Sequence, residues 1–309
     1  MTSNAYTQLD AKDWYPLDNG SFPDNHTHPF GWEPDSDGFR GHIFVSQDNS
    51  TVVVSVKGTS AGWLVGGGGP TVKKDLLNDN LLFSCCCARV GPTWSTVCGC
   101  YQGGGKCDVE CLEDAVAEES LFYGVGINLY NNVTYMYPNA NIWFTGHSLG
   151  GSLSSLIGAT FGLPVVTFEA PGDRLAARRL HLPTYPNMDH ITHVRNNADS
   201  IAMGTCTGVT SVCALGGYAL ESKCHLGKTI LYDTVGQLGW STGTGAHGIK
   251  AVIDDVLSKP WPFKVDADVG EENRGREVPL PKEEEDCEDC YSWEFGHYRN
   301  GSASAHGSC

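Results

Sequence analysis

The chain has 309 residues, of which 40% are hydrophobic, and its formal net charge at pH 7 is −16. This length fits one large domain or two small ones, with enough apolar side chains for a core. The negative charge argues against a nucleic-acid partner, because such partners require basic patches. It also argues against static adhesion to anionic membranes at neutral pH. With 11 histidines and a pI near 5.0, the net charge would approach zero in an acidic compartment, although an ordinary acidic surface gives the same numbers.

Thirteen cysteines are many for a cytosolic enzyme and favour an oxidising, lumenal or secreted setting. Because the cysteine count is odd, at least one thiol stays unpaired, and we expect this to be Cys309. Cys287 and Cys290 have the spacing of zinc ligands, but no second such pair completes a four-ligand set, so we expect no metal site. Five N-x-S/T sequons support the same setting as glycosylation candidates: Asn19, Asn25, Asn49, Asn132 and Asn300.

Targeting signals are missing from the sequence as it stands. No apolar run reaches the roughly 18 residues that a membrane-spanning helix needs. The first residues, Met1-Thr-Ser-Asn-Ala-Tyr-Thr7, do not resemble a signal peptide. A cysteine-rich chain of this kind is expected to be a lumenal domain excised from a longer protein.

Before residue 140 the pattern predicts two strands, a cysteine-rich region and one helix. Residues 1–38 are polar, contain Pro and Gly, and are expected to wrap the surface. Strands are predicted at 39–45 and 51–57, joined by a short polar turn. Residues 84–111 are rich in cysteine and glycine and predict a stapled loop region, and a helix is predicted over 111–130.

A regular alternation of strands and helices follows. The predicted elements are a strand at 141–146, a helix at 149–161, a strand at 164–168, a helix at 173–180 and a strand at 190–195. This order implies an α/β fold with a largely parallel sheet flanked by helices. Residues 247–258 predict an amphipathic helix.

The most informative motif is Gly146-His147-Ser148-Leu149-Gly150. It is a G-x-S-x-G pentapeptide between a predicted strand and a helix of small residues, which is the setting of the nucleophile elbow in α/β-hydrolases. The turn forces the serine into a strained backbone conformation, and only the two glycines let the strand and the helix pack so closely. The motif predicts Ser148 as the catalytic nucleophile. The alternative is a serine in an ordinary strand–helix turn.

A serine nucleophile needs a histidine base, and the base needs an orienting carboxylate. In this fold the three residues follow in the order Ser, Asp, His. Asp199 lies just beyond the strand predicted at 190–195, at the carboxyl edge of the sheet where ligand chemistry gathers, and is the predicted acid. Asp189 precedes that strand and would lie at the wrong edge, and Asp173 is expected to cap the helix that begins there.

His247, in a loop that opens a helix downstream of the acid, is the predicted base. His225 is the main alternative, but its neighbour Cys224 suggests a segment that is tied down structurally. His147 is adjacent to the nucleophile, and its side chain is expected to point away from Ser148. For each histidine the structural alternative is a partly buried side chain without a chemical role.

Two backbone N–H groups are predicted to form the oxyanion hole. The N–H of Leu149 points from the helix N-terminus toward the developing oxyanion. In this fold the second donor comes from the loop after an earlier strand, which here is Gly58-Thr59. Thr59 would offer its N–H and, as an additional donor, its hydroxyl.

These residues resemble the class 3 lipases, in which a strand with Gly-Thr, a flap, Gly-His-Ser-Leu-Gly-Gly and then Asp and His follow one another. Longer motifs narrow the resemblance to the autophagy-related vacuolar phospholipases of fungi. They are Gly62-Trp-Leu-Val-Gly-Gly-Gly-Gly-Pro70, Asn78-Asp-Asn-Leu-Leu-Phe-Ser-Cys-Cys-Cys87, Gly216-Gly-Tyr-Ala-Leu-Glu-Ser-Lys-Cys-His-Leu-Gly227 and Cys287-Glu-Asp-Cys-Tyr-Ser-Trp-Glu-Phe-Gly296. The resemblance covers nearly the whole chain and implies the same triad, Ser148, Asp199 and His247.

The resemblance implies a serine lipase or phospholipase without cofactor or metal, which hydrolyses acyl esters of membrane glycerophospholipids and disintegrates autophagic bodies and intravacuolar vesicles. The implied partner is a phospholipid membrane in the lumen of the vacuole or lysosome, reached by the endosomal multivesicular-body route. Family members carry an N-terminal membrane anchor, which we expect to be absent here. They often have Pro after the triad Asp, where this chain has Ser200 with a free backbone N–H.

We expect residues 1–265 to form one α/β-hydrolase domain, which includes a flap and the cysteine-rich insertion at 59–111. Residues 266–309 are acidic and are expected to be a linker and a tail with a C-x-x-C pair, in which 291–295 docks back. Apolar flap residues are expected to meet lipid, the alternative being that they pack as core beneath the flap. These flap residues are Trp63, Leu64 and Val65.

Other functions share parts of this pattern. A secreted triacylglycerol lipase or a feruloyl-type esterase would use the same triad. A non-catalytic lipid-binding scaffold is the alternative of a different class. The sequence leaves the oligomeric state open.

Overall fold

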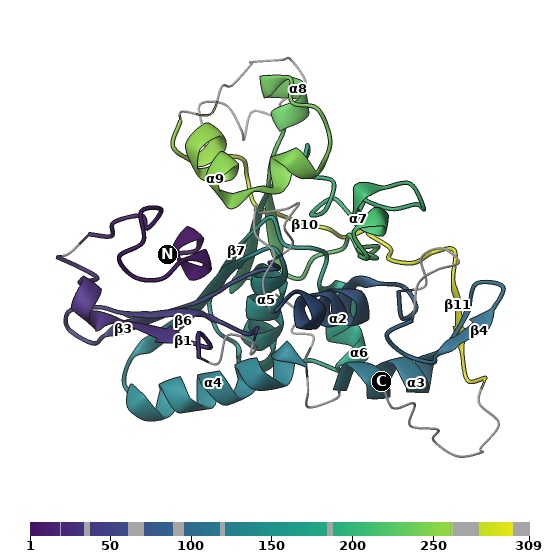
Figure 1. Ribbon diagram of the computed structural model, residues 1–309, viewed down its shortest axis with the longest axis horizontal. Coiled ribbons are helices and arrows are strands. Elements are labelled where there is room, and N and C mark those ends of the chain that lie inside the picture. The colour runs from purple at the N-terminus through teal and green to yellow at the C-terminus, as the bar shows by residue number, and fades with distance from the viewer. Residues whose placement is uncertain are drawn as a thin grey trace.

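The computed structural model describes residues 1–18, 20–33, 38–60, 71–88, 96–117, 121–183, 188–259, 261 and 278–298 (Figure 1). Several predictions concern residues outside these ranges. They are the flap residues Trp63, Leu64 and Val65, the sequons at Asn19 and Asn300, and the unpaired thiol of Cys309.

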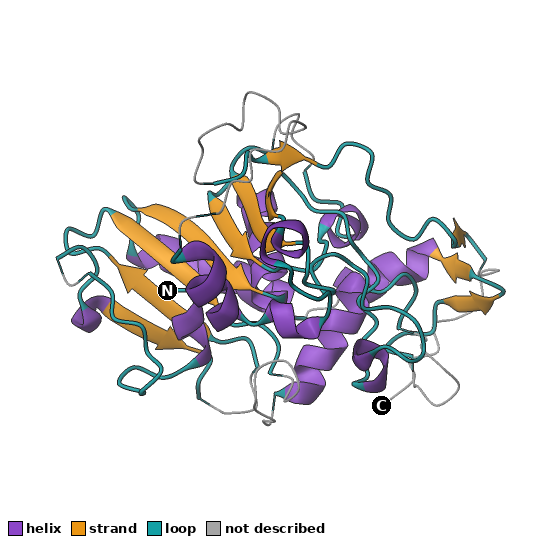
Figure 2. Ribbon diagram, turned by 90° about the horizontal axis from the view of Figure 1, so that it is seen from above, coloured by secondary structure: helices purple, strands orange, loops and turns teal. Residues whose placement is uncertain are grey.

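Among the described residues, eight strands form one sheet in the order β1-β2-β3-β6-β7-β8-β9-β10. From β3 to β9 neighbouring strands are parallel, whereas the pairs β1–β2, β2–β3 and β9–β10 are antiparallel. The mostly parallel sheet flanked by helices confirms the predicted α/β class (Figure 2). The strands are Thr27–Phe30 (β1), Gly41–Val45 (β2), Thr51–Val56 (β3), Asn141–His147 (β6), Val165–Phe168 (β7), Ile191–Asn196 (β8), Lys228–Tyr232 (β9) and Lys282–Glu283 (β10).

The helices lie on both sides of this sheet. They are α2 (Val72–Phe83), α3 (Val109–Ala117), α4 (Phe122–Met136), α5 (Leu149–Phe161), α6 (Arg174–Arg179), α7 (Val212–Leu215), α8 (Thr234–Leu238) and α9 (Ile249–Ala251). Shorter helical turns are η1 (Ser3–Tyr6), η2 (Asp24–His26), η3 (Thr244–His247) and the π-helical η4 (Val252–Leu257). None of the helices in the described ranges combines the length and the hydropathy that crossing a bilayer requires.

The helix α5 is the centre of the core. All its residues from Leu149 to Ala159 are buried, because the small side chains let it approach the strands. A Cβ added at Gly158 would lie 2.2 Å from Val165 Cγ2 of β7. On its other side α5 meets α4, where a Cβ at Gly126 would lie 2.5 Å from Ile157 Cδ1. This close packing fixes the start of α5, and with it the turn that carries Ser148.

A second, three-stranded sheet lies at the opposite end of the molecule from β1 and β3 (Figure 1). It consists of β11 (Glu294–Gly296), β5 (Lys106–Asp108) and β4 (Tyr101–Gly103) in that order. Its buried side chains are mostly disulfide-bonded cysteines, which pack with Leu112, Tyr101 and Trp293. The disulfides of this region are Cys85–Cys290, Cys86–Cys107, Cys87–Cys98 and Cys100–Cys111, whereas Cys206–Cys213 and Cys224–Cys287 lie outside it.

Residues 278–298 run along the hydrolase domain, and we name them the C-terminal strap. The strap adds β10 to the edge of the main sheet and β11 to the small sheet. Its two cysteines, Cys287 and Cys290, form disulfides to Cys224 and Cys85, so neither is available as a zinc ligand. A domain boundary at residue 265 stays a prediction, because residues 262–277 lie outside the described ranges.

Two predicted elements were wrong in extent. The single helix expected over 111–130 is two helices, α3 and α4. The N–H of Phe122, the first residue of α4, donates to Asn78 Oδ1 of α2 at 2.8 Å. This cap comes from a distant segment, so no local pattern signals it. The helix expected over 247–258 starts two residues later, at Ile249, and continues without a break from α9 into the π-helical η4, which ends at Leu257.

Residues 1–38 do more than wrap the surface. They contribute β1 to the edge of the main sheet, and the residues Ser3, Asn4 and Ala5 of η1 are buried. The Asn4 amide bonds both the carbonyl and the N–H of Tyr15, at 2.8 and 2.9 Å, so polar residues are buried here at little cost. A polar composition alone therefore mislabelled this segment as surface.

Candidate active site

Ser148 occupies a strained turn between β6 and α5. Its φ of 57° and ψ of −134° are rare for a residue with a side chain. A Cβ at Gly146 would lie 2.3 Å from the Gly150 carbonyl oxygen, and a Cβ at Gly150 would lie 2.3 Å from the Val56 carbonyl oxygen. Neither position therefore accepts a side chain, as the pentapeptide predicts.

The structure brings the three predicted triad residues together. His247 Nε2 lies 2.9 Å from Ser148 Oγ, and His247 Nδ1 lies 2.6 Å from Asp199 Oδ2. Because an ionised carboxylate only accepts hydrogen bonds, Nδ1 carries the imidazole proton and Nε2 accepts the serine hydroxyl proton. Asp199 and His247 are fully buried and Ser148 is 4% exposed. This arrangement can perform nucleophilic acyl transfer.

Backbone pairing holds the two loops of the triad side by side. Asp199 bridges Gly243, which precedes η3, and the Gly243 N–H donates to Ala198 O at 2.9 Å. The N–H that Ser200 provides in place of a proline donates to Gly243 O at 3.5 Å. That N–H is therefore used to join the loop of Asp199 to the loop of His247.

The predicted oxyanion donors flank Ser148. Leu149 is the first residue of α5, so its N–H has no partner within the helix. The loop of Thr59 reaches the nucleophile from β3, since a Cβ at Gly58 would lie 2.9 Å from Ser148 Cβ. Thr59 Oγ1 donates to Asp79 Oδ2 at 2.6 Å, so the hydroxyl orients the loop and the N–H is left as the donor.

Two carboxyl groups of α2 and a lysine, all buried, support this loop. Burial raises the pKa of Asp79 well above its usual range, although the Thr59 hydroxyl lowers it. Asp75 accepts the Ser60 N–H at 2.8 Å and lies 3.9 Å from Lys57 Nζ. Burial lowers the pKa of Lys57 to about 8. The loop is thereby fixed by buried carboxyl groups from α2.

His147 points away from Ser148, as predicted. Its Nε2 lies 2.7 Å from the carbonyl oxygen of His247, so this nitrogen carries the proton, and its Nδ1 accepts from the Tyr6 hydroxyl at 2.6 Å. Burial lowers the pKa of His147 to about 3, and His247 beside it adds to the effect. A neutral His147 therefore anchors the backbone of the base, and Tyr6 of η1 fixes His147 in turn.

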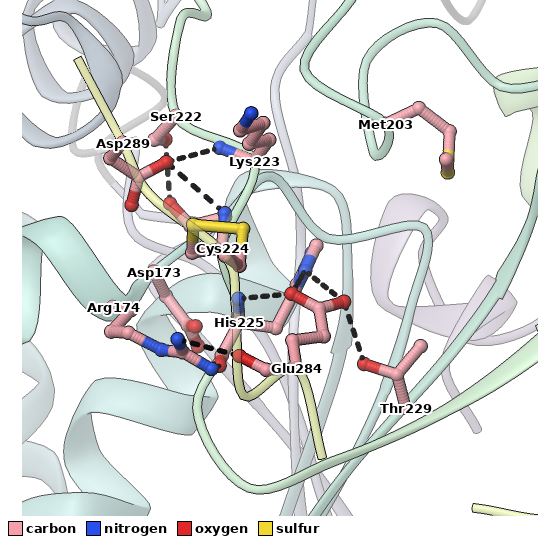
Figure 3. The surroundings of a disulfide bond; sticks show 12 residues. Asp173, Arg174, Met203, Ser222, Lys223, Cys224, His225, Thr229, Glu284 and Asp289 are labelled. Carbon is pink, nitrogen blue, oxygen red and sulfur yellow. Dashed lines mark hydrogen bonds and ion pairs between the residues drawn. A yellow bond between two sulfur atoms is a disulfide. The ribbon is translucent and has the colours of Figure 1, made fainter. Parts of the chain in front are cut away.

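The alternative triad candidates lie elsewhere. His225 Nε2 donates to the Ala170 carbonyl oxygen at 2.9 Å, and its Nδ1 lies 3.4 Å from Glu284 Oε2 of the strap (Figure 3). Asp173 stands before α6 but makes no side-chain cap; instead its Oδ1 accepts the Leu226 N–H at 2.8 Å. Burial raises the pKa of Asp173 to about 6. The expectation that Asp173 caps α6 was therefore wrong.

Sequence reasoning missed three residues of this site. Tyr6 gives no local signal, because its role depends on a contact across the chain. Asn196 is the last residue of β8, and Glu169 follows β7, at the same carboxyl edge as Asp199. Asn196 Nδ2 donates to Glu169 Oε1 at 2.9 Å and to the carbonyl oxygen of Ala246, next to His247, at 3.1 Å. A search for polar residues at the carboxyl end of every predicted strand, as for Asp199, would have found both residues.

Sequence comparison identifies relatives of this chain. The family model described as Lipase (class 3) matches residues 107–202, which include Ser148 and Asp199. A protein of Cryptococcus neoformans named "Putative lipase ATG15" is 50% identical over 96% of this chain and 66% of its own length. The proteins of that name from Mycosarcoma maydis and Saccharomyces cerevisiae are 56% and 46% identical, over 86% and 99% of this chain.

The chain spans only part of these relatives, 52% of the Mycosarcoma maydis protein and 56% of the Saccharomyces cerevisiae protein. Among solved structures, the Lip2 lipase of Yarrowia lipolytica aligns with a TM-score of 0.33 and 15% identity. That alignment covers 69% of this chain and 67% of Lip2. At this TM-score and identity the alignment gives no information about the active site.

Proposed function

Because the chain belongs to the class 3 lipases, a family of lipase-type ester hydrolases, we propose that it is a serine phospholipase acting on membrane glycerophospholipids. The observation that supports this proposal is the unbroken hydrogen-bond chain from Ser148 Oγ through His247 to Asp199. A serine in an ordinary strand–helix turn has no such chain behind it.

In the proposed reaction Ser148 Oγ attacks the ester carbonyl carbon while His247 Nε2 takes the hydroxyl proton. The oxyanion that forms accepts hydrogen bonds from the N–H groups of Leu149 and Thr59. His247 then gives its proton to the leaving alkoxide, and an acyl-serine remains. A water molecule then gives a proton to His247 and attacks the acyl-serine carbonyl carbon; the bond to Ser148 Oγ breaks, His247 returns the proton to Ser148 Oγ, and the fatty acid is released. Asp199 holds the imidazole in the required tautomer throughout.

The setting is part of the proposal. The relatives' name supports action on autophagic bodies, and the cysteines and sequons support a lumenal compartment such as the vacuole, reached by the multivesicular-body route. In the structure the sequon residues Asn25, Asn49 and Asn132 are exposed, so glycosylation is sterically feasible there. Action at the acidic pH of such a compartment requires that the triad keep its protonation states there.

Lipid product analysis tests this proposal. The chain and its Ser148→Ala variant would be incubated with mixed phospholipid and triglyceride vesicles at pH 5 and pH 7, and the products identified by mass spectrometry. Ser50→Ala, an exposed serine in the β2–β3 turn, is the matched control. We expect fatty acid and lysophospholipid from the wild type and the control, and none from Ser148→Ala.

The other outcomes separate the alternatives. Release from triglyceride alone would indicate a triacylglycerol lipase and overturn the phospholipase assignment. No release, with no labelling of Ser148 by a fluorophosphonate probe in the folded protein, would leave a lipid-binding scaffold. Activity that collapses below pH 6 would contradict action in an acidic lumen.

A further inference from the structure

We propose that Glu169 is a positioning residue for the triad: a buried carboxylic acid that keeps its proton and donates it in a hydrogen bond to Asp199, holding Asp199 ionised and aimed at His247. This inference rests on the proposed serine-hydrolase function. It adds a second carboxyl group, from a different strand, to the three triad residues.

Glu169 lies at the carboxyl end of β7, next to the nucleophile. The residue before it, Phe168, accepts the N–H of Ser148 at 3.1 Å through its carbonyl oxygen. Glu169 is fully buried, and its φ of 46° is in the left-handed region that a side chain disfavours. A buried carboxyl group on a strained backbone persists only where its surroundings hold it, and such positions cluster at active sites.

Asn196 connects Glu169 to the loop of the base. Glu169 Oε1 accepts the backbone N–H and the side-chain Nδ2 of Asn196, at 3.1 and 2.9 Å. The same Nδ2 group donates to the carbonyl oxygen of Ala246 at 3.1 Å, one residue before His247. Glu169 is thus linked through one buried amide to the segment that carries the imidazole.

Glu169 Oε2 also accepts the Asn196 N–H, at 3.2 Å, and Glu169 interacts with Asp199 as well. A side-chain hydrogen bond joins the two carboxyl groups. Because ionised carboxylates only accept, this bond requires a proton on one of them. Asp199 already accepts the His247 Nδ1–H at 2.6 Å and the Ile201 N–H at 2.8 Å, which favours its anionic form. Glu169 also accepts N–H groups, but they belong to the neutral amide and backbone of Asn196. Asp199, by contrast, faces the imidazole that becomes cationic in the reaction, so we place the proton on Glu169.

The electrostatic surroundings agree with this assignment. Burial raises the pKa of Glu169 well above its usual range, and the charge of Asp199 raises it further. For Asp199, burial raises the pKa, but His247 and the hydrogen bond from Glu169 outweigh burial and leave it below the usual value. Two opposite shifts in one buried pair assign one carboxyl as acid and the other as anion.

Other titratable groups around the pair come from two further elements. Arg195 of β8 interacts with both carboxyl groups, but its guanidinium is engaged by Glu284 of the strap and by the Ala202 carbonyl oxygen. His147 at the end of β6 interacts with Asp199 and is neutral, because burial lowers its pKa to about 3. A neutral Glu169 hence adds no second negative charge and keeps Asp199 ionised to a lower pH.

Glu169→Gln and Glu169→Gly separate this role from a merely structural one. Glutamine keeps the shape, donates to Asp199 through its amide and accepts from Asn196 through its oxygen. Glycine suits the left-handed backbone and removes the side chain. Two quantities would be measured against pH: the rate of Ser148 labelling by a fluorophosphonate, and the downfield NMR signal of the proton between His247 Nδ1 and Asp199, assigned by its loss in His247→Asn.

We expect Glu169→Gln to label within about threefold of the wild-type rate, with the acid limb of its pH profile unmoved. Glu169→Gly is expected to label roughly tenfold to a hundredfold more slowly, because the orienting carboxylate loses a fixed partner. Its acid limb and the loss of its NMR signal should both move to higher pH.

Glycine and wild-type profiles with the same acid limb would overturn the assignment, since a structural role lowers the folded fraction without moving that limb. Equal losses in both variants would also overturn it, because a neutral donor would then not suffice. If the wild type is not labelled at all, the proposed function fails. The NMR signal then still decides whether Glu169 governs the ionisation of Asp199.

Discussion

The pair of His247 and Asp199 faces a nucleophile, whereas another histidine–carboxylate pair of the described residues, His225 and Glu284, does not. His247 pairs with Asp199 and presents Nε2 to Ser148 Oγ. His225 pairs with Glu284 of the C-terminal strap (Figure 3). Its Nε2, however, donates to the backbone carbonyl oxygen of Ala170. Since the carbonyl only accepts, Nε2 of His225 keeps its proton and cannot act as a base there.

The comparison shows that the second ring nitrogen decides the role of such a pair. In both pairs the carboxylate lies beside Nδ1 of the histidine. At the active site Nε2 of His247 accepts a proton from the Ser148 hydroxyl. At the strap Nε2 of His225 donates to the Ala170 carbonyl oxygen, which only holds the segment in place. Glu284 also engages Arg195 and accepts the Thr229 hydroxyl at 3.1 Å, so it joins the strap to the sheet.

The largest difference between the pairs is expected from matched histidine variants. His247→Asn should lower kcat by roughly 10⁴-fold or more, because the general base is lost. His225→Asn should leave the activity of the folded protein within about threefold, but should destabilise it by about 1–3 kcal/mol, because buried hydrogen bonds are lost. Esterase kinetics and thermal unfolding of both variants check this contrast.

The two histidine variants together test which histidine is the general base. If a fully folded His225→Asn variant had no activity, the assignment of His247 as the base would be wrong. If His247→Asn kept its activity, the triad itself would be wrong. Circular dichroism of both proteins establishes that the comparison is between folded molecules.

Much of the catalytic side of this contrast was predictable, because it depends on local steric rules. The two glycines around Ser148 predict the nucleophile elbow. The position of Asp199 just after a predicted strand marks it as the triad acid. The helix α5 was predicted at its observed bounds, 149–161, because a run of small and apolar residues after a strand indicates a helix that packs closely on the sheet.

The strap side was not predictable in the same way. No feature near His225 indicates that Glu284 will lie against it, because the contact joins residues far apart in the sequence. Disulfide connectivity is likewise invisible, since many pairings of thirteen cysteines satisfy the same spacing. The start of α4 depends on a cap from Asn78, and the missed strand β9 is fixed by its neighbours β8 and β10.

Removing the disulfide next to His225 and Glu284 should lower the stability of the fold without affecting catalysis. Cys224 and Cys287 close a loop with a sequence separation of 63, so the double alanine variant is expected to lose about 4 kcal/mol of unfolding free energy. The active site lies elsewhere, so the folded variant should keep its kcat. Denaturant unfolding of oxidised protein measures the first effect, and a fall in kcat of the folded variant would contradict the separation of the two regions.

The strap carboxylate should give stability a pH dependence of its own. Burial alone would raise the pKa of Glu284, but its bond to His225 and the charges of His225 and Arg195 lower it to about 2. A depressed pKa stabilises the fold above the unfolded value and loses that contribution as pH falls through the folded value. Glu284→Gln should therefore cost about 3 kcal/mol near pH 7 and progressively less toward pH 2. Unfolding free energies of both proteins across this range check the slope, and a cost independent of pH would contradict it.

The smallest effect is expected where a structural carboxyl group supports catalysis. Asp79 accepts the Thr59 hydroxyl at 2.6 Å and so holds the loop whose N–H is proposed to meet the oxyanion. Thr59→Val removes that bond without changing side-chain shape and should lower kcat about tenfold with KM nearly unchanged, since the N–H is stabilising only in the transition state. Thr59→Ser keeps the hydroxyl and should stay close to wild type. Equal kcat values for valine and serine would mean that packing alone orients the loop. Asp79 would then belong with Glu284, as a carboxyl group that serves the fold rather than the reaction.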